Sequence, residues 1–424
     1  MTRSALCTGL LVFGISTIAQ AQAPASAQAP AQNAGQAATT TSQAAATTSK
    51  PTLEIYGFGQ ADAIVDFDTN NPDWYDVMRP SKLPAFRNEF GQDGHFYLSP
   101  RQSRFGAKGE LMTDSGPVKG VFEFDMFGVG AFAGETTIRL RHAWGQWRQV
   151  GGGLTNSQFM DVDVFPNILD YWGPNGMLFF RNTQMFWEPY VNGDSNIRVA
   201  IENPGASGDA GRLANRVELS NVLGRFPAPD ITGHYRMGRG WGYVQVGGAL
   251  RYLAWDDRLE DQFDLSGHVW GWGISLSSNV KPTSNDVLRL QVIYGKGVEN
   301  YFNDAPIDVG AERNPGDPRT PVTGEALQDV GISAYLEHNW NSRWSSAIGY
   351  ASVNIKNSDL QLPDAFHEGE YASANLLWAP VTNVMMGGEL QWLHRENFSD
   401  GFESTDRRVQ FSFRYSFSAK ITGE

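Results

Sequence analysis

Arg139 and Arg141 are the residues whose type and spacing most clearly indicate a chemistry. They alternate with Ile138 and Leu140, so an extended chain would place both guanidinium groups on one face and the apolar side chains on the other. A guanidinium stays charged at any working pH, and its planar fork binds a carboxylate through two N–H groups. The pair therefore predicts a polar surface that attracts small anions.

The same alternation places further arginines on polar strand faces, and we expect them to line one wet interior with the first pair. They are Arg104, Arg181, Arg198, Arg236, Arg251 and Arg289. The alternative is that each arginine only neutralises a neighbouring carboxylate, such as Glu123, Asp125, Glu202 or Glu389. Pairs of that kind are individually weak. Two arginines side by side favour the functional interpretation for Arg139 and Arg141, and both interpretations stand for the others.

Motifs for catalysis or cofactor binding are missing from the sequence. It contains no G-x-S-x-G and no H-E-x-x-H, and its seven histidines are scattered. The stretch GVGAFAG at 128–134 imitates a dinucleotide fingerprint, but it lies in a short loop between expected strands with no helix after it. We therefore expect no catalytic residue, no cofactor and no metal, although a lipid-hydrolysing or purely structural barrel stays an alternative.

The elements that must position the arginines follow from a period of two. Polar and apolar residues alternate in 119–126, 138–141, 197–202, 243–252, 288–294, 371–378, 383–392 and 409–417. This is the pattern of strands with one apolar and one polar face. A soluble sandwich would show the same period, so the connections must decide between the two folds.

Short and long connections alternate along the chain. The tight ones are expected at 113–117, 149–153, 189–194, 237–241, 280–285, 340–343 and 379–382, and the longer ones include 68–93, 204–228 and 299–325. Short turns at one rim and longer loops at the other are typical of outer-membrane barrels, whose strand number is even. The segments predict an all-β protein, a transmembrane antiparallel barrel of about 16 strands.

The ends of the chain differ from the middle. Residues 1–21 have a charged start, an apolar run and an A-x-A site, which predicts a secretory signal peptide. Residues 22–51 are a low-complexity Ala/Gln/Thr segment, expected to be a tail in the periplasm. The barrel is predicted for 52–417, with 53–67 pairing the last strand, and 418–424 is left as an extension. The net charge of −13 argues against nucleic acid as a partner.

Several stretches resemble the DcaP-like porins, within the general porin superfamily of Gram-negative bacteria. They are RFGAKGEL (104–111), TTIRLRHAWGQW (136–147), SQFMDVDVFPNILDYWGPNGMLFFRNTQ (157–184), PAPDITGHYRMGRGWGYVQVGGALRYL (227–253) and YASANLLWAPVTNVMMGGELQWLHREN (371–397). The resemblance implies a homotrimer in the outer membrane, surrounded by its lipids and lipopolysaccharide. It also implies passive uptake of small anionic solutes, with dicarboxylates as the substrate class.

In such porins the third outer loop folds into the barrel and narrows it. The corresponding segment here is 159–177, which carries Asp161, Asp163 and Asp170. Carboxylates on this loop would face the arginines across the water path and set up a transverse field. A dicarboxylate would then step from one arginine to the next. A non-selective or cation-preferring pore is the alternative, because many carboxylates share the interior.

The other outer loops carry carboxylates of their own. Glu299, Asp304, Asp308, Glu312 and Asp317 lie in the loop 299–325, and Asp68, Asp73 and Asp76 lie in 68–93. Their oxygens suit calcium or magnesium, but no loop has the spacing of a calcium-binding hand. We expect a solvated acidic rim.

Overall fold

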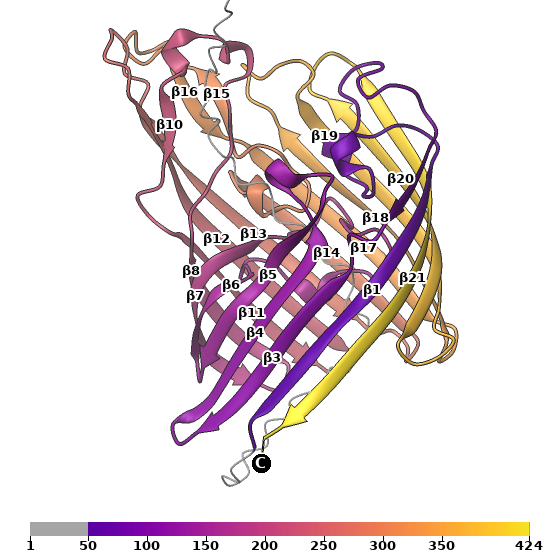
Figure 1. Cartoon of the computed structure of the whole chain (residues 1–424). Helices are drawn as coiled ribbons and strands as arrows, with labels where there is room; N and C mark the ends of the chain where they lie inside the picture. Colours follow the sequence, from indigo (N-terminus) through magenta and orange to yellow (C-terminus); the bar gives the residue numbers. More distant parts are fainter. Residues whose placement is uncertain (1–49, 424) are drawn as a thin grey trace, which may run out of the picture.

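A closed antiparallel β-barrel of 16 strands forms the body of the computed structural model, which describes residues 50–423 (Figure 1). β2 and β3 pair in succession with β1 and together make one barrel strand interrupted at 100–103. The barrel strands are β1 (Thr52–Asp66), β2 (His95–Ser99), β3 (Arg104–Thr113), β4 (Gly116–Phe127), β5 (Thr136–Trp147), β6 (Val150–Asn156), β7 (Arg181–Asn192), β8 (Ser195–Glu202), β11 (Asp230–Arg239), β12 (Gly242–Asp257), β13 (Gly267–Val280), β14 (Asp286–Lys296), β17 (Gln328–Asn339), β18 (Trp344–Lys356), β19 (Phe366–Trp378), β20 (Val384–Asn397) and β21 (Glu403–Thr422). The predicted all-β fold, an antiparallel barrel of 16 strands, is confirmed.

Short elements lie in the connections between these strands. They are β9 (Gly208–Asp209), β10 (Val222–Arg225), β15 (Val309–Arg313), β16 (Val322–Ala326) and the one-turn 3-10 helices η1 (Pro72–Trp74), η2 (Pro80–Lys82), η3 (Gly130–Phe132), η4 (Val162–Val164), η5 (Gly211–Leu213), η6 (Val217–Leu219) and η7 (Glu299–Tyr301). β10 extends the edge of β12, and β9, β15 and β16 form a small separate sheet. In the part of the chain that the structure describes, no helix has the length and apolar character to cross a membrane.

The barrel closes through β1 and β21. β1 pairs with β21 from Thr52, opposite Thr422, to Asp66, opposite Arg408, and with β3 on its other side. The last strand therefore continues past Phe417, because β1 offers partners as far as Thr52. Residues 418–422 belong to this strand and are not a separate extension. The predicted signal peptide and nearly all of the tail lie outside the described residues.

The two faces of the barrel wall have the reverse polarity of a soluble sandwich. In β13, Trp270 and Ile274 are more than half exposed, whereas Ser275 and Ser277, which follow them on the opposite face of the strand, are buried. A soluble sheet would bury its apolar face. An outward apolar face and an inward polar face are what a barrel in lipid requires, so the sandwich alternative is ruled out.

The connections alternate as the sequence predicted. Short turns gather at the rim where β1 begins and β21 ends, and longer segments gather at the opposite rim (Figure 1). The turn between β17 and β18 covers 340–343, as expected. In Figure 1 the part of 67–94 that contains η2 lies near β19 and β20, and η2 contacts both of these strands.

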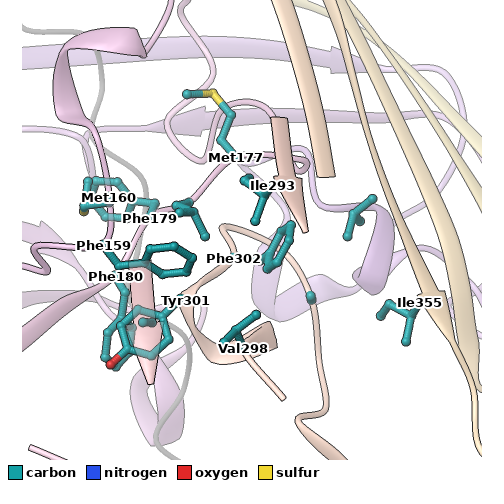
Figure 2. Close-up of a cluster of buried hydrophobic side chains, with 14 of the residues drawn as sticks. Phe159, Met160, Met177, Phe179, Phe180, Ile293, Val298, Tyr301, Phe302 and Ile355 are labelled. Carbon is teal, nitrogen blue, oxygen red and sulfur yellow. The ribbon is translucent and has the colours of Figure 1, made fainter. Parts of the chain in front are cut away.

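A hydrophobic cluster lies between the segment 157–180, which joins β6 to β7, and the segment 297–327, which joins β14 to β17. Phe159, Phe179, Tyr301 and Phe302 are central to it (Figure 2). The rings of Phe159 and Tyr301 meet edge to face at 5.7 Å, a favourable aromatic geometry. The cluster packs the two segments against each other, and it fixes the backbone that carries Asp161 and Asp163.

Candidate functional site

Arg139 and Arg141 meet two carboxylates of the neighbouring strand and one tyrosine of 157–180. Arg139 donates to Asp125 through Nη2 at 2.6 Å and Nε at 3.0 Å. Arg141 donates through Nε to Glu123 at 2.7 Å and through Nη1 to Asp125 at 2.8 Å. Both guanidinium groups also donate to the Tyr171 hydroxyl at 2.7 Å. The hydroxyl in turn donates to Asp125. The tyrosine thus ties the segment 157–180 to β4 and β5.

A β-bulge explains how Arg141 reaches this network. Glu123 pairs with His142 and Phe124 pairs with Leu140, so Arg141 is the extra residue of β5. A bulge re-aims a side chain toward a site, and here Arg141 and His142 are both buried. Arg141 is completely covered, whereas the Arg139 side chain keeps 12% of its exposure.

Two further predicted arginines join this group. The Arg104 guanidinium lies 3.6 Å from Glu123, and Arg181 lies close enough to interact with the charges of Asp125 and Arg141. Four guanidinium groups therefore surround two carboxylates, which leaves two positive charges. We call the set of Arg104, Arg139, Arg141 and Arg181 the arginine cluster.

Arg198 and Arg236 line a cavity of about 180 Å³ on the other side of 157–180. Arg198 donates to Glu188 at 2.7 Å, and Arg236 donates to Asp163 at 2.5 Å. The Arg236 guanidinium also stacks 3.5 Å from the ring centroid of Tyr243. Because Arg236 lies between the Tyr243 ring and the Asp163 carboxylate, its positive charge is held at the cavity wall.

Asp161 is buried at the wall of this cavity, and its hydrogen bonds hold neighbouring residues of the wall in place. It accepts hydrogen bonds from the Tyr243 hydroxyl at 2.8 Å and from Ser277 Oγ at 2.6 Å, and Arg236 lies 3.8 Å away. Burial, followed by the charge of Asp163, raises the pKa of Asp161. Because both neighbours donate to it, the carboxylate orients the walls of the cavity.

The remaining predicted arginines have other surroundings. Arg289 donates to Glu337 at 2.7 and 2.9 Å and to the Asp163 carbonyl. Arg251 is completely buried, between Asp230 at 3.0 Å and Asp308 at 2.7 Å. For Arg251 the geometry fits the alternative interpretation, an arginine that neutralises interior carboxylates.

Asp170 does not face the arginine cluster directly. It accepts hydrogen bonds from the backbone N–H groups of Met78 at 3.2 Å and Gly173 at 3.1 Å. Burial, and after it the charge of Glu389, raises the pKa of Asp170 to about 8. Its position links 157–180 to 67–94 and to β20, so the three predicted aspartates do not form one row.

The predicted acidic rim is wrong for four of its members. Asp76 is buried and paired with Arg101. Glu299, Asp304 and Asp308 have no exposed surface. Asp304 accepts from Arg79 at 2.8 Å, and the Arg79 guanidinium lies between the rings of Trp74 and Trp172 at 4.3 and 4.2 Å. These loops pack inside the barrel, where carboxylates must find partners.

Sequence reasoning missed two residues of the site, Tyr171 and Arg414. Arg414 is buried on β21 and stacks 4.4 Å from the ring of Phe58, which Arg104 also approaches at 5.3 Å. Its Nε donates to Gln60 at 2.5 Å. Strict alternation of 409–417 was the signal that would have found Arg414. Nothing in the local sequence distinguishes Tyr171 from other tyrosines.

A protein family and several solved structures are similar to this chain. The model of the family described as DcaP outer membrane protein matches residues 20–417. Comparison with curated protein sequences gave no match. The crystal structure of the outer membrane channel DcaP of Acinetobacter baumannii is similar at 18% identity and a TM-score of 0.70, over 87% of this chain and 98% of that one.

Two other solved structures share the fold at lower similarity. The anion-selective porin from Comamonas acidovorans has 12% identity and a TM-score of 0.54, over 87% of this chain and 100% of its own. OmpT of Vibrio cholerae in a trimer form has 10% identity and a TM-score of 0.52, with the same two coverages. At these identities the similarity describes the barrel fold.

Proposed function

Because the chain belongs to the DcaP outer membrane protein family, and is therefore a barrel of the bacterial outer membrane, we propose that it is a passive porin for small anionic solutes. Dicarboxylates are the substrate class that its arginines suit best, since two anionic ends match guanidinium groups spaced along one wall. Uptake is diffusive, so selectivity comes from the width of the path and from the charges that line it.

The arginine cluster is the observation that carries this proposal. Its four guanidinium groups exceed the two carboxylates Glu123 and Asp125, so the local field favours anions. Arg139 retains exposure and its Nη1 has no partner. This nitrogen is itself covered by protein, so the exposed remainder of the Arg139 side chain is the part that a passing carboxylate would meet.

Segment 157–180 narrows the path in this proposal. Its backbone binds polar residues on distant parts of the wall: the Leu169 N–H donates to Glu389 at 2.7 Å and the Asn167 N–H donates to Glu337 at 2.6 Å. Asn279 Nδ2 donates to the Asp163 carbonyl at 2.7 Å. Contacts with β13, β17 and β20 support a loop that crosses the interior and leaves the passage beside β4 and β5.

A cation-preferring or non-selective pore is the second candidate, and one observation favours it. Around the cavity next to Arg198 and Arg236, the acidic side chains are Glu188, Asp161 and Asp163. They outnumber the two arginines there. Current measurement distinguishes the candidates because the two charged regions would select ions of opposite sign.

The partners in this proposal are the solute, the surrounding lipid and two further copies of the chain. The exposed apolar face supports contact with outer-membrane lipids and lipopolysaccharide. A homotrimer is supported by the similarity to a porin known in a trimer form. The tail of residues 22–51 is proposed to lie in the periplasm, since β1 begins at the rim with the short turns.

The test is the reversal potential of the purified protein in a planar bilayer under a salt gradient, followed by addition of succinate. Anion preference with blockade by succinate is the expected result. Cation preference without blockade would overturn the anion assignment and leave the barrel. Release of fatty acid from phospholipid vesicles would instead support the lipid-hydrolase alternative, and absence of any current would support a structural barrel.

A further inference from the structure

Two arginine side chains lie close together on the inner wall where the barrel closes. Arg104 is on β3 and Arg414 is on β21, and both strands pair with β1 (Figure 1). The Arg104 side chain keeps 8% of its exposure, and Arg414 keeps 4%. Both guanidinium groups lie against the ring of Phe58 on β1, at 5.3 and 4.4 Å from its centroid, and their charges interact. The seam of the barrel thus holds two like charges that are almost covered.

The hydrogen bonds of these two side chains do not match two covered charges. Within the described residues the Arg104 guanidinium makes no hydrogen bond: its Nε and Nη2 are covered without a partner, and Glu123 lies 3.6 Å away. The Arg414 guanidinium makes one, from Nε to the amide oxygen of Gln60 at 2.5 Å, and its Nη2 is covered without a partner. A charged group that gives up its hydration without gaining partners raises the free energy of the folded state.

The carboxylates near this pair are engaged by other groups. Glu123 accepts from Nε of Arg141 at 2.7 Å. Asp62, whose charge also acts on Arg414, accepts from the hydroxyl of Ser412 at 2.5 Å. Neither carboxylate therefore supplies a hydrogen bond to Arg104 or Arg414.

Other covered arginines of the described interior have full sets of acceptors. Arg251 donates to Asp230, to Asp308 and to two backbone carbonyls. Arg395 donates to three backbone carbonyls and to the amide oxygen of Asn397. Arg104 and Arg414 differ from both because their N–H groups lack acceptors in the chain, which points to an acceptor that the chain does not supply.

Each of the two guanidinium groups retains one nitrogen that such an acceptor can reach. Nε and Nη2 of Arg104 and Nη2 of Arg414 are covered, and Nε of Arg414 is bound to Gln60. The nitrogen with access to open space is therefore Nη1 in both side chains. The required acceptor is negative, because it must compensate two positive charges, and it is compact, because so little of either side chain is open.

We propose that Arg104 and Arg414 bind one small inorganic anion, with chloride as the ion that fits best, and that this ion fastens β3 and β21 to each other across β1. The bound anion supplies the acceptor that both guanidinium groups lack and offsets the repulsion between them. Chloride is a single spherical atom, so it accepts N–H groups from any direction. Sulfate and phosphate carry four oxygens each and need more room and more donors. The site does not depend on which ions the pore passes.

The rival explanation is that water and the ring of Phe58 satisfy the two arginines. Buried water commonly bonds polar groups that lack protein partners, and an aromatic face attracts a cation. The two explanations differ in one measurable respect. Only a bound anion makes the stability of the barrel depend on which anion is in the buffer at constant ionic strength.

Anomalous scattering from crystals of the full chain grown in bromide is the direct test, because bromide substitutes for chloride and is located by its absorption edge. We expect a bromide peak within hydrogen-bonding distance of Arg104 and Arg414, beside Phe58. The absence of a peak at this place would overturn the proposal, and so would a peak that contacts only Arg139 in the water path.

Heat unfolding of the purified protein tests the same site in solution. We compare chloride with a bulky sulfonate of equal ionic strength, and we expect chloride to raise the unfolding midpoint of the wild type. Chloride at ten times its dissociation constant should shift the unfolding equilibrium roughly elevenfold. Equal midpoints in the two salts would overturn the proposal and favour water.

Variants locate the effect of chloride. Arg414→Gln and Arg104→Gln should each lose the difference between the two salts. Arg414→Gln should fold, because it removes one of two like charges and a bond to a neutral amide. Arg216→Gln is the control, since Arg216 is 61% exposed and pairs with Glu218, and it should keep the difference.

A chloride effect that persists in folded Arg414→Gln and Arg104→Gln would place the ion elsewhere and overturn the proposal. If neither variant folds, the bromide peak and the comparison of salts in the wild type still decide between the anion and water.

Discussion

Replacing Arg139 should mainly change ion selectivity, and replacing Arg141 should mainly change the stability of the fold, although the two residues lie close together on one strand. Arg141 is fully buried and binds Glu123, Asp125 and Tyr171. Arg141→Gln leaves those groups short of a cation, and breaking a buried ion pair costs about 3–5 kcal/mol. Arg139→Gln leaves Asp125 with Arg141, so its cost should be about 1 kcal/mol, as for partly exposed pairs.

For ion permeation the order should be the opposite: Arg139→Gln should have the larger effect and Arg141→Gln the smaller one. A carboxylate 4 Å from a guanidinium gains about 1 kcal/mol in a watery path and more where the walls lower the dielectric response. Loss of Arg139 should therefore reduce the anion-to-cation permeability ratio by roughly fivefold. Arg141→Gln, if folded, should change this ratio less, because its charge is covered and compensated by two carboxylates.

The assays are the reversal potential under a salt gradient and the midpoint of heat unfolding, both on purified protein. Arg216→Gln is the matched control, since Arg216 pairs with Glu218 in the outer segment 203–229 with 61% of its side chain exposed. The Arg216→Gln substitution should change neither the reversal potential nor the unfolding midpoint. An unchanged reversal potential in Arg139→Gln, or an unchanged midpoint in Arg141→Gln, would refute the assignment of the two roles.

Three further changes test other parts of the site. Asp170 ionises near pH 4 in an unfolded chain and near pH 8 in the folded one, so the folded state holds the extra proton between these values. Stability should fall as the pH rises through this window, by about 1.4 kcal/mol for each unit, and level off above pH 8. Asp170→Asn should flatten that dependence, measured as the unfolding midpoint between pH 5 and 9; an equal slope in the variant would contradict the role of Asp170. Tyr171→Phe removes the hydroxyl shared by Arg139 and Arg141, at about 1.5–3 kcal/mol for a bond to a charged group, and should raise single-channel conductance as 157–180 loosens. An unaltered conductance would mean that other contacts hold the segment. Arg414→Gln should lower the anion-to-cation permeability ratio with little loss of stability, since the Nε of Arg414 donates to the neutral amide of Gln60; an unchanged reversal potential would exclude it from the path.

The wall of the barrel was predictable because its signal is local. The alternation in 138–141 lies within β5, the stretch 136–147 that resembles the DcaP-like porins coincides with the bounds of β5, and 340–343 was recognised as a turn. Arg139 followed from that alternation alone. Arg141 was assigned to the same face by the same rule, yet it reaches the site through a bulge that shifts the register between Glu123 and Phe124. A bulge depends on the partner strand, so one segment of sequence does not reveal it.

The interior was predictable only in part, since it depends on contacts between distant segments. Four loop carboxylates expected in solvent are buried because 67–94 and 297–327 fold against the wall, where Asp304 meets Arg79. The pairing partner of Arg79 lies 225 residues away. The charge and the length of a loop, read from the sequence, do not predict a contact between segments so far apart. The length of the last strand was likewise set by its partner β1 and not by its own aromatic alternation.

The pairing of β1 with β21 has a consequence for how the protein is made. Asp66 and Arg408, which bind each other across this seam, are 342 residues apart in the chain. Every backbone group at the open edges of the sheet must be paired in lipid, so the first strand synthesised waits for the last. Until then the sheet has two free edges, which are templates for wrong association. A nascent chain of this protein therefore needs a chaperone that covers the two free edges of the sheet. Any truncation within β21 should produce an aggregate and not a leaky pore.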